Sequence, residues 1–398
     1  MNKHLDNKRK FHTLDGIRGI AALIVCMKHA HGFFLHSGTF QEGYLAVDIF
    51  FAMSGVVLAN AYEQRLKTGL SALRFAWIRL VRFYPLYALG FGLSLACLWG
   101  HFFGFPMDHL NVLIPLAILL LPNVAGFAHG SPFPLNVPAW TLLYELWVNV
   151  LYGKFISLLR TRNLVIIVAL SSVGLIAGEH FYPLHSMDFG WTQRSFPFGS
   201  FRVAYSYFLG VIIYRKYAAR GFPQLSRHSQ PAAWALLALL AALLLSVPAA
   251  PVQAYFDFVC VAVVLPAIVY AALHFEPVGY TRNICKFLGV ISYPVYAIHW
   301  PLEILINGEF KKLTGVSLDN YAPYSGIVFI ALLMLLCWAL NSLYDVKIRE
   351  FVLAKTGSKP RRVSGRLAAQ ALDTGGAGMF TAVQPLLPLS ETGPRSRP

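Results

Sequence analysis

The sequence predicts an all-α integral membrane protein, a polytopic bundle of about ten transmembrane helices with both termini cytoplasmic. Of its 398 residues, 57% are hydrophobic and only 13% are charged, whereas soluble domains carry about a quarter charged residues. The apolar residues come in blocks of roughly 18–22 separated by short polar stretches, as bilayer-spanning helices require. Strict alternation of apolar and polar residues is missing, which excludes a closed β-barrel and leaves helices.

Ten apolar blocks are long enough to be spans, and they fall near residues 15–35, 44–62, 84–103, 140–159, 163–179, 200–215, 231–249, 255–274, 287–307 and 324–344. A further block at 112–122 has only about 11 continuous apolar residues, with Pro115 inside it. It suits a re-entrant or surface segment better than a span. The basic N-terminus runs into the first block without a small-residue cleavage site, which predicts a retained first helix.

The formal net charge of +15 is explained by the loops and not by nucleic-acid binding. With ten spans and the N-terminus inside, 27 of the 33 lysines and arginines fall on cytoplasmic segments, as the positive-inside rule requires. A full span at 112–122 would move every later loop to the opposite side of the membrane and largely abolish this bias. The predicted organisation is a basic cytoplasmic N-terminus over 1–13, a transmembrane domain over 14–345, and a cytoplasmic, largely disordered tail over 346–398.

Several titratable side chains lie inside the predicted spans. Arg18 and His29 are 11 residues apart on the first span, so they share a helical face and are separated by about 16 Å along the axis. His29, Asp48, Glu145 and His299 are all expected in the outer half of the bilayer, on four different spans. Ionisable groups in a membrane are costly and usually functional. A shared polar cavity is therefore predicted, although each residue alone also fits a structural hydrogen bond.

Five short motifs along the chain, GIRGIAALIVCMKH, GYLAVDIFFAMSG, RLVRFYP, PAWTLLYELW and ISYPVYAIHWP, occur in this order. They carry Arg18 and His29; Asp48 and Ser54; Arg79, Arg82 and Tyr84; Trp140 and Glu145; and Tyr293 and His299. Over roughly residues 12–345 the sequence resembles membrane acyltransferase family 3, the bacterial integral-membrane sugar O-acyltransferases. Thr141 stands where that family usually has a serine, a change that keeps the hydroxyl.

The resemblance implies an O-acetyltransferase that uses cytoplasmic acetyl-CoA as its acyl donor. Arg79 and Arg82, with Arg18 and Tyr84, are expected to bind the donor, because arginine forks match phosphate oxygens. The alternative for the two neighbouring arginines is a positive-inside anchor. The five cysteines show no metal-ligand spacing, so no metal is expected.

His29 is the implied general base on the acceptor hydroxyl, since imidazole titrates near neutral pH. Asp48 or Glu145 is expected to orient it and to stabilise the imidazolium. Ser54 or Tyr293 is expected to donate to the developing oxyanion. A covalent route through an acetylated His29 stays open beside direct transfer.

The implied acceptor is a cell-surface or lipid-linked glycan of O-antigen or exopolysaccharide type, outside a bacterial inner membrane. His299, Tyr293 and Trp140 are expected to contact it, and aromatic residues in the loops at 104–139 and 180–199 suit either sugar rings or an interfacial belt. Open alternatives are a longer acyl donor, a small-molecule acceptor such as a macrolide, a transporter or flippase of lipid-linked sugar, and a non-enzymatic scaffold. The loop histidines, expected to be solvated or interfacial, are His31, His36, His101 and His129.

Overall fold

The computed structural model describes residues 10–34, 40–103, 109–125, 130–181, 186–221 and 229–356. All regular elements over these residues are helical, so the all-α prediction is confirmed for them. Six helices of the described chain are long and apolar enough to cross a membrane, and one more apolar helix is shorter. The protein is therefore a multi-pass membrane protein, while ten spans and cytoplasmic termini stay predictions.

A helix or helical segment lies on each of the ten predicted spans: α1 (His12–His29), α2 (Ala46–Lys67), α3 (Ala72–Trp99), α5 (Ala139–Lys154), α6 (Thr161–Phe181), α7 (Phe196–Ala219), α8 (Ser229–Leu244), α9 (Gln253–Val259) continuing into α10 (Leu265–Ala272), α11 (Gly279–Thr314) and α12 (Tyr324–Leu340). The other α-helices are α4 (Leu110–Ile118) and α13 (Val346–Lys355). Short helical turns are η1 (His31–Phe33), η2 (Gln41–Leu45), η3 (Ala250–Val252), η4 (Cys260–Val264), η5 (Leu318–Tyr321) and η6 (Asn341–Asp345).

The short block at 112–122 forms α4, which has nine residues with Pro115 inside. A helix of that length rises about 13 Å, less than half the hydrocarbon thickness of a bilayer. It is held against α3 by two tyrosine hydroxyls, of which Tyr84 donates to the Ile118 carbonyl over 2.8 Å and Tyr87 to the Ala117 carbonyl. The segment is a short surface helix and not a span of its own.

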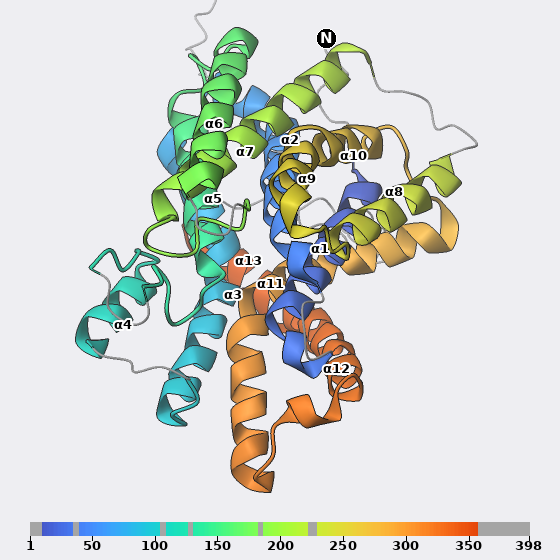
Figure 1. Cartoon of the computed structure of the whole chain (residues 1–398). Coiled ribbons are helices and arrows are strands. Elements are labelled where there is room, and N and C mark those ends of the chain that lie inside the picture. Colours follow the sequence, from blue (N-terminus) through green and yellow to red (C-terminus); the bar gives the residue numbers. More distant parts are fainter. Residues whose placement is uncertain are drawn as a thin grey trace, which may run out of the picture.

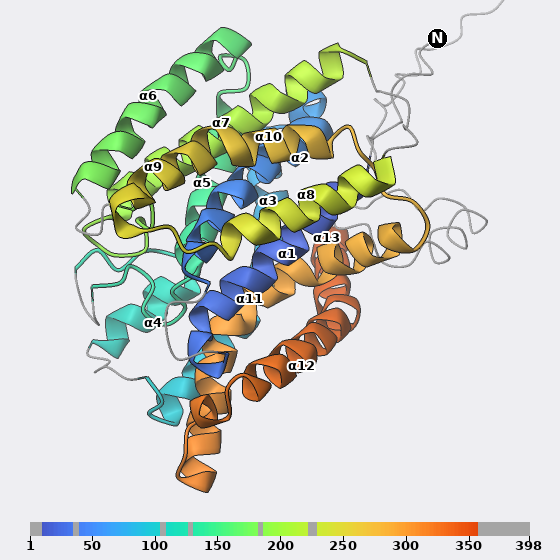
Figure 2. The same cartoon turned by 45° about the vertical axis from the view of Figure 1, so that its right-hand side comes forward.

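Helix α1 lies inside the bundle, packed against α11, α8 and α2 (Figures 1 and 2). Its contact with α11 needs Gly19, because a Cβ there would overlap Leu288. Small residues allow such close helix approach in membrane proteins. The two helices run in the same direction, since Arg18 contacts Ser292 while His29, further along, contacts His299.

Helices α2 and α7 form the second close pair of the bundle. A Cβ on Gly55 would overlap the Tyr207 carbonyl, so the two backbones approach closely at that point. Their early turns face each other at the same level, where Asp48 of α2 meets Arg202 of α7. This contact is buried, since Asp48 is 2% exposed and Arg202 is 0% exposed.

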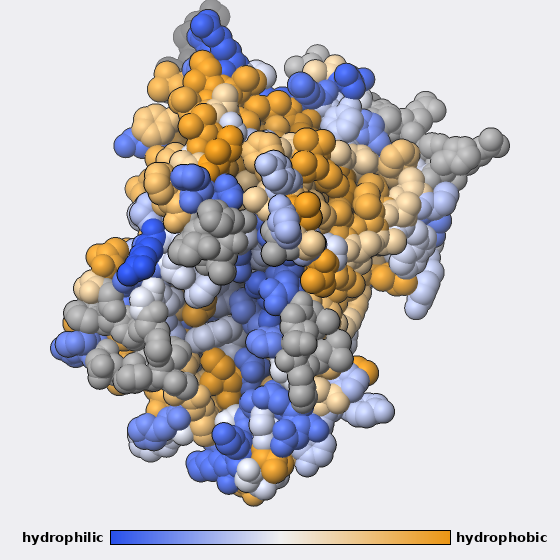
Figure 3. All heavy atoms as spheres, in the orientation of Figure 1, coloured by the Kyte–Doolittle hydropathy of each residue, from blue (hydrophilic) through white to orange (hydrophobic). Residues whose placement is uncertain are grey.

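Large apolar side chains cover the outside of the bundle, for example Leu170, Val173, Ile327 and Leu332. Figure 3 shows apolar residues over the upper part of one face and hydrophilic residues around a hollow near its middle. Exposed apolar area of this extent is expected where helices face lipid.

The C-terminal part of the described chain turns back onto α3. After α12, the π-helical turn η6 leads into α13, and α13 packs against α3. The Tyr344 hydroxyl donates to the Pro85 carbonyl over 3.1 Å. The first ten residues of the predicted tail are therefore helical as α13. Residues 1–9 and 357–398 lie outside the described residues, so disorder of the rest of the tail stays a prediction.

Candidate functional site

Two cavities lie side by side in the bundle. The first, called here the arginine cavity, has a volume of about 80 Å³ and is lined by polar residues that include Arg18, Ser54, Arg79, Arg82, Glu145 and Ser292. The second, called the histidine cavity, has a volume of about 460 Å³ and is lined by residues that include Lys28, His29, Trp140, Asp188, Trp191 and Trp300. Val47 and Tyr296 line both cavities, so they form the wall that the cavities share.

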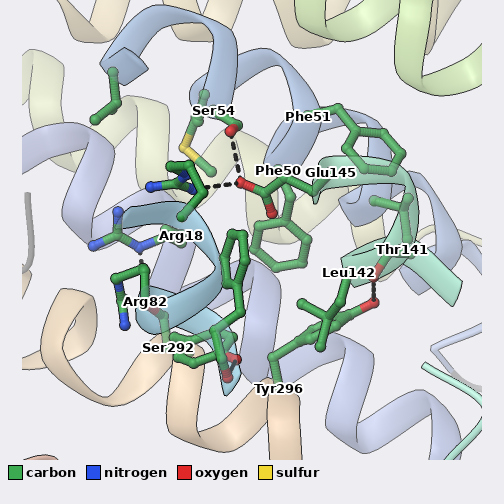
Figure 4. Close-up of a pocket in the computed structure, with 16 residues that line it drawn as sticks. Arg18, Phe50, Phe51, Ser54, Arg82, Thr141, Leu142, Glu145, Ser292 and Tyr296 are labelled. Carbon is green, nitrogen blue, oxygen red and sulfur yellow. Dashed lines mark hydrogen bonds and ion pairs between the residues drawn. The ribbon is translucent and has the colours of Figure 1, made fainter. Parts of the chain in front are cut away.

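The arginine cavity gathers three of the residues predicted to bind the donor. Arg18 donates from Nε to the Ser292 hydroxyl over 2.9 Å and from a terminal nitrogen to Asp15 over 2.8 Å. Arg79 is 3% exposed, and Arg82 lies over the Tyr293 ring at 4.8 Å. Figure 4 shows Arg18, Arg82 and Ser292 on one side of the cavity. Arg18, Arg79 and Arg82 thus line one cavity, while their role in donor binding stays a prediction.

Glu145 lies opposite these arginines. Its Oε1 accepts a hydrogen bond from the Ser54 hydroxyl over 2.6 Å and another from Arg79 over 3.2 Å. Helices α2, α3 and α5 each contribute one member of this group. The sequence motifs named the three residues separately and did not predict that they contact one another. Glu145 fixes Arg79 and Ser54 on the cavity wall, and it makes no described contact with His29.

His29, which lines the histidine cavity, pairs with His299, and the protonation of the two rings can be worked out from their contacts. Nδ1 of His299 lies 2.9 Å from the Val295 carbonyl and 3.0 Å from the Tyr296 carbonyl. Carbonyl oxygens only accept, so this Nδ1 carries the proton, and in the neutral imidazole Nε2 of His299 is then an acceptor. Nδ1 of His29 is 2.9 Å from that Nε2 and must therefore donate. The lone pair of His29 is then on its own Nε2.

The expectation that Asp48 or Glu145 orients His29 is wrong for the described structure, where His299 does so. Asp48 Oδ2 pairs with Arg202 at 2.5 Å, and Asp48 Oδ1 accepts from the Ser206 hydroxyl over 3.2 Å. The physical reason is that a fully buried guanidinium requires a counter-charge. Among the described residues Asp48 lines neither cavity, and Glu145 lines only the arginine cavity. The prediction of one cavity shared by all four residues is therefore wrong: His29 and Glu145 line different cavities, and Asp48 and His299 line neither of them.

The remaining predicted residues are divided between the cavities. Trp140 lines the histidine cavity, and its contact with an acceptor stays a prediction. Tyr293 lines the arginine cavity instead, and His299 lies behind His29 with 1% exposure. Tyr84 faces α4 and lines neither cavity described here. Of the loop histidines, His31 and His101 are exposed, His31 also lining the histidine cavity, while His36 and His129 lie outside the described residues.

Sequence reasoning missed an ion pair on the histidine cavity. Lys28 Nζ lies 3.2 Å from Asp188, donates to the Gln41 carbonyl over 3.0 Å, and sits over the Tyr44 ring at 5.0 Å. The position of Lys28 directly before His29 inside a predicted span was a usable signal. Asp188 lies in a loop, where no sequence pattern marked it. Lys28 and Asp188 give the cavity charged groups of both signs, and its tryptophans give it aromatic faces.

The shared wall depends on Thr141. Its hydroxyl is 2.6 Å from the Tyr296 hydroxyl, and Tyr296 also donates to the Pro138 carbonyl over 3.2 Å. The Tyr296 ring packs edge-on against Phe50 at 5.5 Å, and Figure 4 shows the Thr141–Tyr296 pair beside Leu142, away from Arg18 and Arg82. The hydroxyl at position 141 therefore positions the side chain that separates the two cavities.

Comparisons with known proteins agree with this geometry. A family model described as an acyltransferase domain, that of acyltransferase family 3, matches residues 11–342. "Protein 2 in picA locus" of Rhizobium radiobacter is 38% identical over 180 residues, which cover 42% of this chain and 93% of that protein. "Putative acetyltransferase ORF330" of Acidianus two-tailed virus is 26% identical over 312 residues, covering 76% of this chain and 86% of that protein. No solved structure gives a significant match. With its helical membrane bundle and a family match over most of its length, the chain belongs to acyltransferase family 3 and is a multi-pass membrane acyltransferase.

Proposed function

We propose that the protein is a membrane O-acetyltransferase that transfers an acetyl group from cytoplasmic acetyl-CoA to a hydroxyl of a cell-surface or lipid-linked glycan, in the inner membrane of a bacterium. The observation that carries the proposal is the contact of His29 Nδ1 with His299 Nε2. It leaves a basic nitrogen, Nε2, on a residue that lines a cavity large enough for a sugar hydroxyl and its ring. A positioned imidazole of this kind is suited to general base catalysis.

The donor side of the proposal rests on the arginine cavity. Arg18, Arg79 and Arg82 all line it, and guanidinium groups bind phosphates with charge-assisted, forked hydrogen bonds. Arg18 and His29 are separated by about 16 Å along α1, a distance that an extended pantetheine arm covers. The phosphates would bind at the arginines, and the thioester would reach the wall formed by Val47 and Tyr296.

The proposed chemical step needs only His29 as a proton carrier. His29 Nε2 takes the proton from the acceptor hydroxyl while the hydroxyl oxygen bonds to the thioester carbonyl carbon. The carbon–sulfur bond then breaks, the acetyl ester is complete, and the thiolate of coenzyme A takes the proton from His29. His299 keeps the other ring nitrogen of His29 occupied, so Nε2 is the nitrogen that acts in both proton transfers.

The acceptor side of the proposal rests on the walls of the histidine cavity. Trp140, Trp191 and Trp300 supply flat aromatic faces, which suit the apolar faces of sugar rings. Lys28 and Asp188 supply a donor and an acceptor for hydroxyl groups. A hydroxylated ring fits such a mixture of aromatic and polar groups better than a purely apolar ligand does.

The proposal is tested by the O-acetyl content of surface glycans in a deletion strain complemented with wild type, His29→Ala or His101→Ala. His101 is an exposed histidine and controls for the loss of an imidazole as such. Wild type and His101→Ala are expected to restore the ester, and His29→Ala is expected to fail at equal membrane abundance. Unchanged ester levels in all strains would exclude a surface glycan as acceptor, and full restoration by His29→Ala would exclude His29 as the base.

A further inference from the structure

We propose that the histidine cavity selects a neutral sugar ring over a sugar that carries an acidic group, such as a uronic acid, and that the ion pair between Lys28 and Asp188 sets this preference. The inference rests on the proposed sugar acceptor and narrows it to one chemical class. Both residues line the cavity, Lys28 from α1 and Asp188 from the loop between α6 and α7.

The charged side chains that line the histidine cavity already have partners within the protein. They are Lys28, Asp188 and Arg202. Lys28 Nζ lies 3.2 Å from an Asp188 oxygen, and Arg202 is paired with Asp48 at 2.5 Å. All three guanidinium nitrogens of Arg202 donate to Asp48 or to backbone carbonyls. Each positive charge at the cavity therefore has a carboxylate partner, and an acidic acceptor finds no free cation there.

Both members of the Lys28–Asp188 pair are held through one buried carboxylate, Asp257 of α9. Asp257 Oδ2 accepts hydrogen bonds from the Tyr44 hydroxyl over 2.6 Å and from the Met187 backbone N–H over 2.7 Å. The Tyr44 ring in turn lies 5.0 Å from Lys28 Nζ. Met187 is the residue directly before Asp188 in the chain. Because Asp257 is 0% exposed, the ion pair is a fixed part of the cavity wall and differs from a chance contact of two surface side chains.

A second buried carboxyl group lies beside Asp257. The Gln253 amide donates to Glu42 over 3.0 Å and to Asp257 over 2.8 Å, so one side chain bridges the two carboxyl groups. Within the described chain, neither carboxyl group has a lysine or arginine partner. Any charge on this pair is therefore negative, and it lies behind Tyr44, which lines the cavity. Such a charge repels an acidic acceptor and adds to the effect of the ion pair.

A neutral ring can be bound without breaking the ion pair. The side chains of Lys28 and Asp188 are 24% and 21% exposed, so a ligand in the cavity can reach both. Lys28 has three N–H donors and directs two of them at Asp188 and at the Gln41 carbonyl, which leaves one for a sugar hydroxyl. A carboxylate on the sugar would have to displace Asp188 from Lys28 and would leave two like charges side by side. Unfavourable contacts of this kind reject the wrong partner.

The test compares neutral and acidic acceptors with the full-length protein in detergent micelles, with acetyl-CoA as the donor and release of free thiol as the readout. The acceptors are matched pairs of methyl glycosides, the gluco, galacto and manno compounds and their uronic acid counterparts, which differ only at C6. Wild type is expected to show a kcat/KM at least about 10-fold higher for a neutral glycoside than for its uronic acid counterpart. An equal or higher value for the uronic acid would overturn the inference.

Two variants test the ion pair itself. Asp188→Asn leaves Lys28 without its carboxylate and is expected to raise the relative kcat/KM of the uronic acid by about 10-fold. Lys28→Gln leaves Asp188 unpaired and is expected to keep the uronic acid at or below its wild-type value. Glu309→Gln is the matched control, because it removes a carboxylate 4.0 Å from Lys312 and lines neither cavity described here. The ratio of two acceptors in one preparation does not depend on the amount of folded protein, so a merely structural loss leaves it unchanged.

The outcomes separate this inference from the proposed function. If Asp188→Asn keeps the wild-type ratio, the ion pair does not set the preference and the inference is wrong, while the sugar acceptor stands. If Glu309→Gln shifts the ratio as much, the effect is general surface charge and the specific role is refuted. If none of the glycosides releases thiol although acetyl-CoA binds, the sugar acceptor is wrong and this inference with it. Should Asp188→Asn not fold, judged by size-exclusion chromatography, Lys28→Gln decides, since a rise in its relative use of the uronic acid contradicts the inference.

Discussion

The reassignment of Asp48 from the catalytic site to the ion pair with Arg202 makes a quantitative prediction. Asp48→Asn removes the carboxylate and leaves Arg202, which is 0% exposed, without its counter-charge. Breaking a buried pair in this way costs about 3–5 kcal/mol, more than a hundredfold in the folding equilibrium. Arg202 keeps its hydrogen bonds to the Phe189 and Tyr44 carbonyls, but neither carbonyl carries a formal charge.

The double variant Asp48→Asn/Arg202→Gln removes both charges together. Because neither side chain is then a buried ion, we expect the double variant to recover about 2–3 kcal/mol relative to the sum of the single losses. Glutamine retains an amide donor for one of the two carbonyls, which limits the new unsatisfied groups. The assay is the midpoint of thermal unfolding in detergent micelles for wild type, both single variants and the double variant.

Acyl-transfer activity per folded protein completes this experiment. If Asp48 acts only through the fold, the double variant should regain stability and keep measurable transfer. A double variant that is stable but inactive would show that the Asp48–Arg202 pair serves the reaction, since Arg202 lines the histidine cavity, and the purely structural assignment of the pair would be refuted. An Asp48→Asn variant that unfolds at the wild-type temperature would refute the energetic argument itself.

Three further predictions concern the histidine pair, the shared wall and the helix packing. His299→Ala removes the acceptor that fixes the tautomer of His29. We expect kcat, measured as release of free thiol, to fall by about 10²- to 10⁴-fold. His299→Gln, whose amide oxygen can accept the same hydrogen bond, should lower kcat less. Thr141→Val removes one hydrogen bond from the wall between the cavities and should slow transfer several-fold, since such a bond contributes about 1 kcal/mol, while Thr141→Ser should match wild type. Gly19→Ala should lower the yield of folded protein in size-exclusion chromatography, whereas Gly92→Ala, at a position with open space around it, should not; equal yields would contradict the packing argument.

Helix positions could be predicted from the sequence, because membrane-spanning segments appear in it as long, mostly apolar blocks. The shared face of Arg18 and His29 on α1 could also be predicted, since a spacing of 11 residues returns the two side chains to one side of a helix. The grouping of Arg79 with Arg18 followed from the sequence motifs. These features depend on local helix geometry, which a sequence carries directly.

The partners of the buried charges could not be predicted. Whether Asp48 faces His29 or Arg202 depends on the rotation of α2 against α7, which is set by tight packing at Gly55, and no periodicity reports it. The same holds for His299, which contacts His29 across 270 residues of sequence.

The close packing of α1 against α11 also has a consequence for biogenesis. Neither helix is among the six that are apolar enough to cross a membrane by composition, and each carries charged or titratable groups that the other satisfies. Ribosomes add about 5–20 residues per second. Synthesis of the 270 residues between His29 and His299 therefore takes roughly 15–55 s. During that time α1 has to stay in the bilayer without α11 to pack against, and the incomplete chain is accessible to quality-control proteases. Defects in α11 should therefore appear first as degradation of nascent protein, before any loss of catalytic rate can be measured.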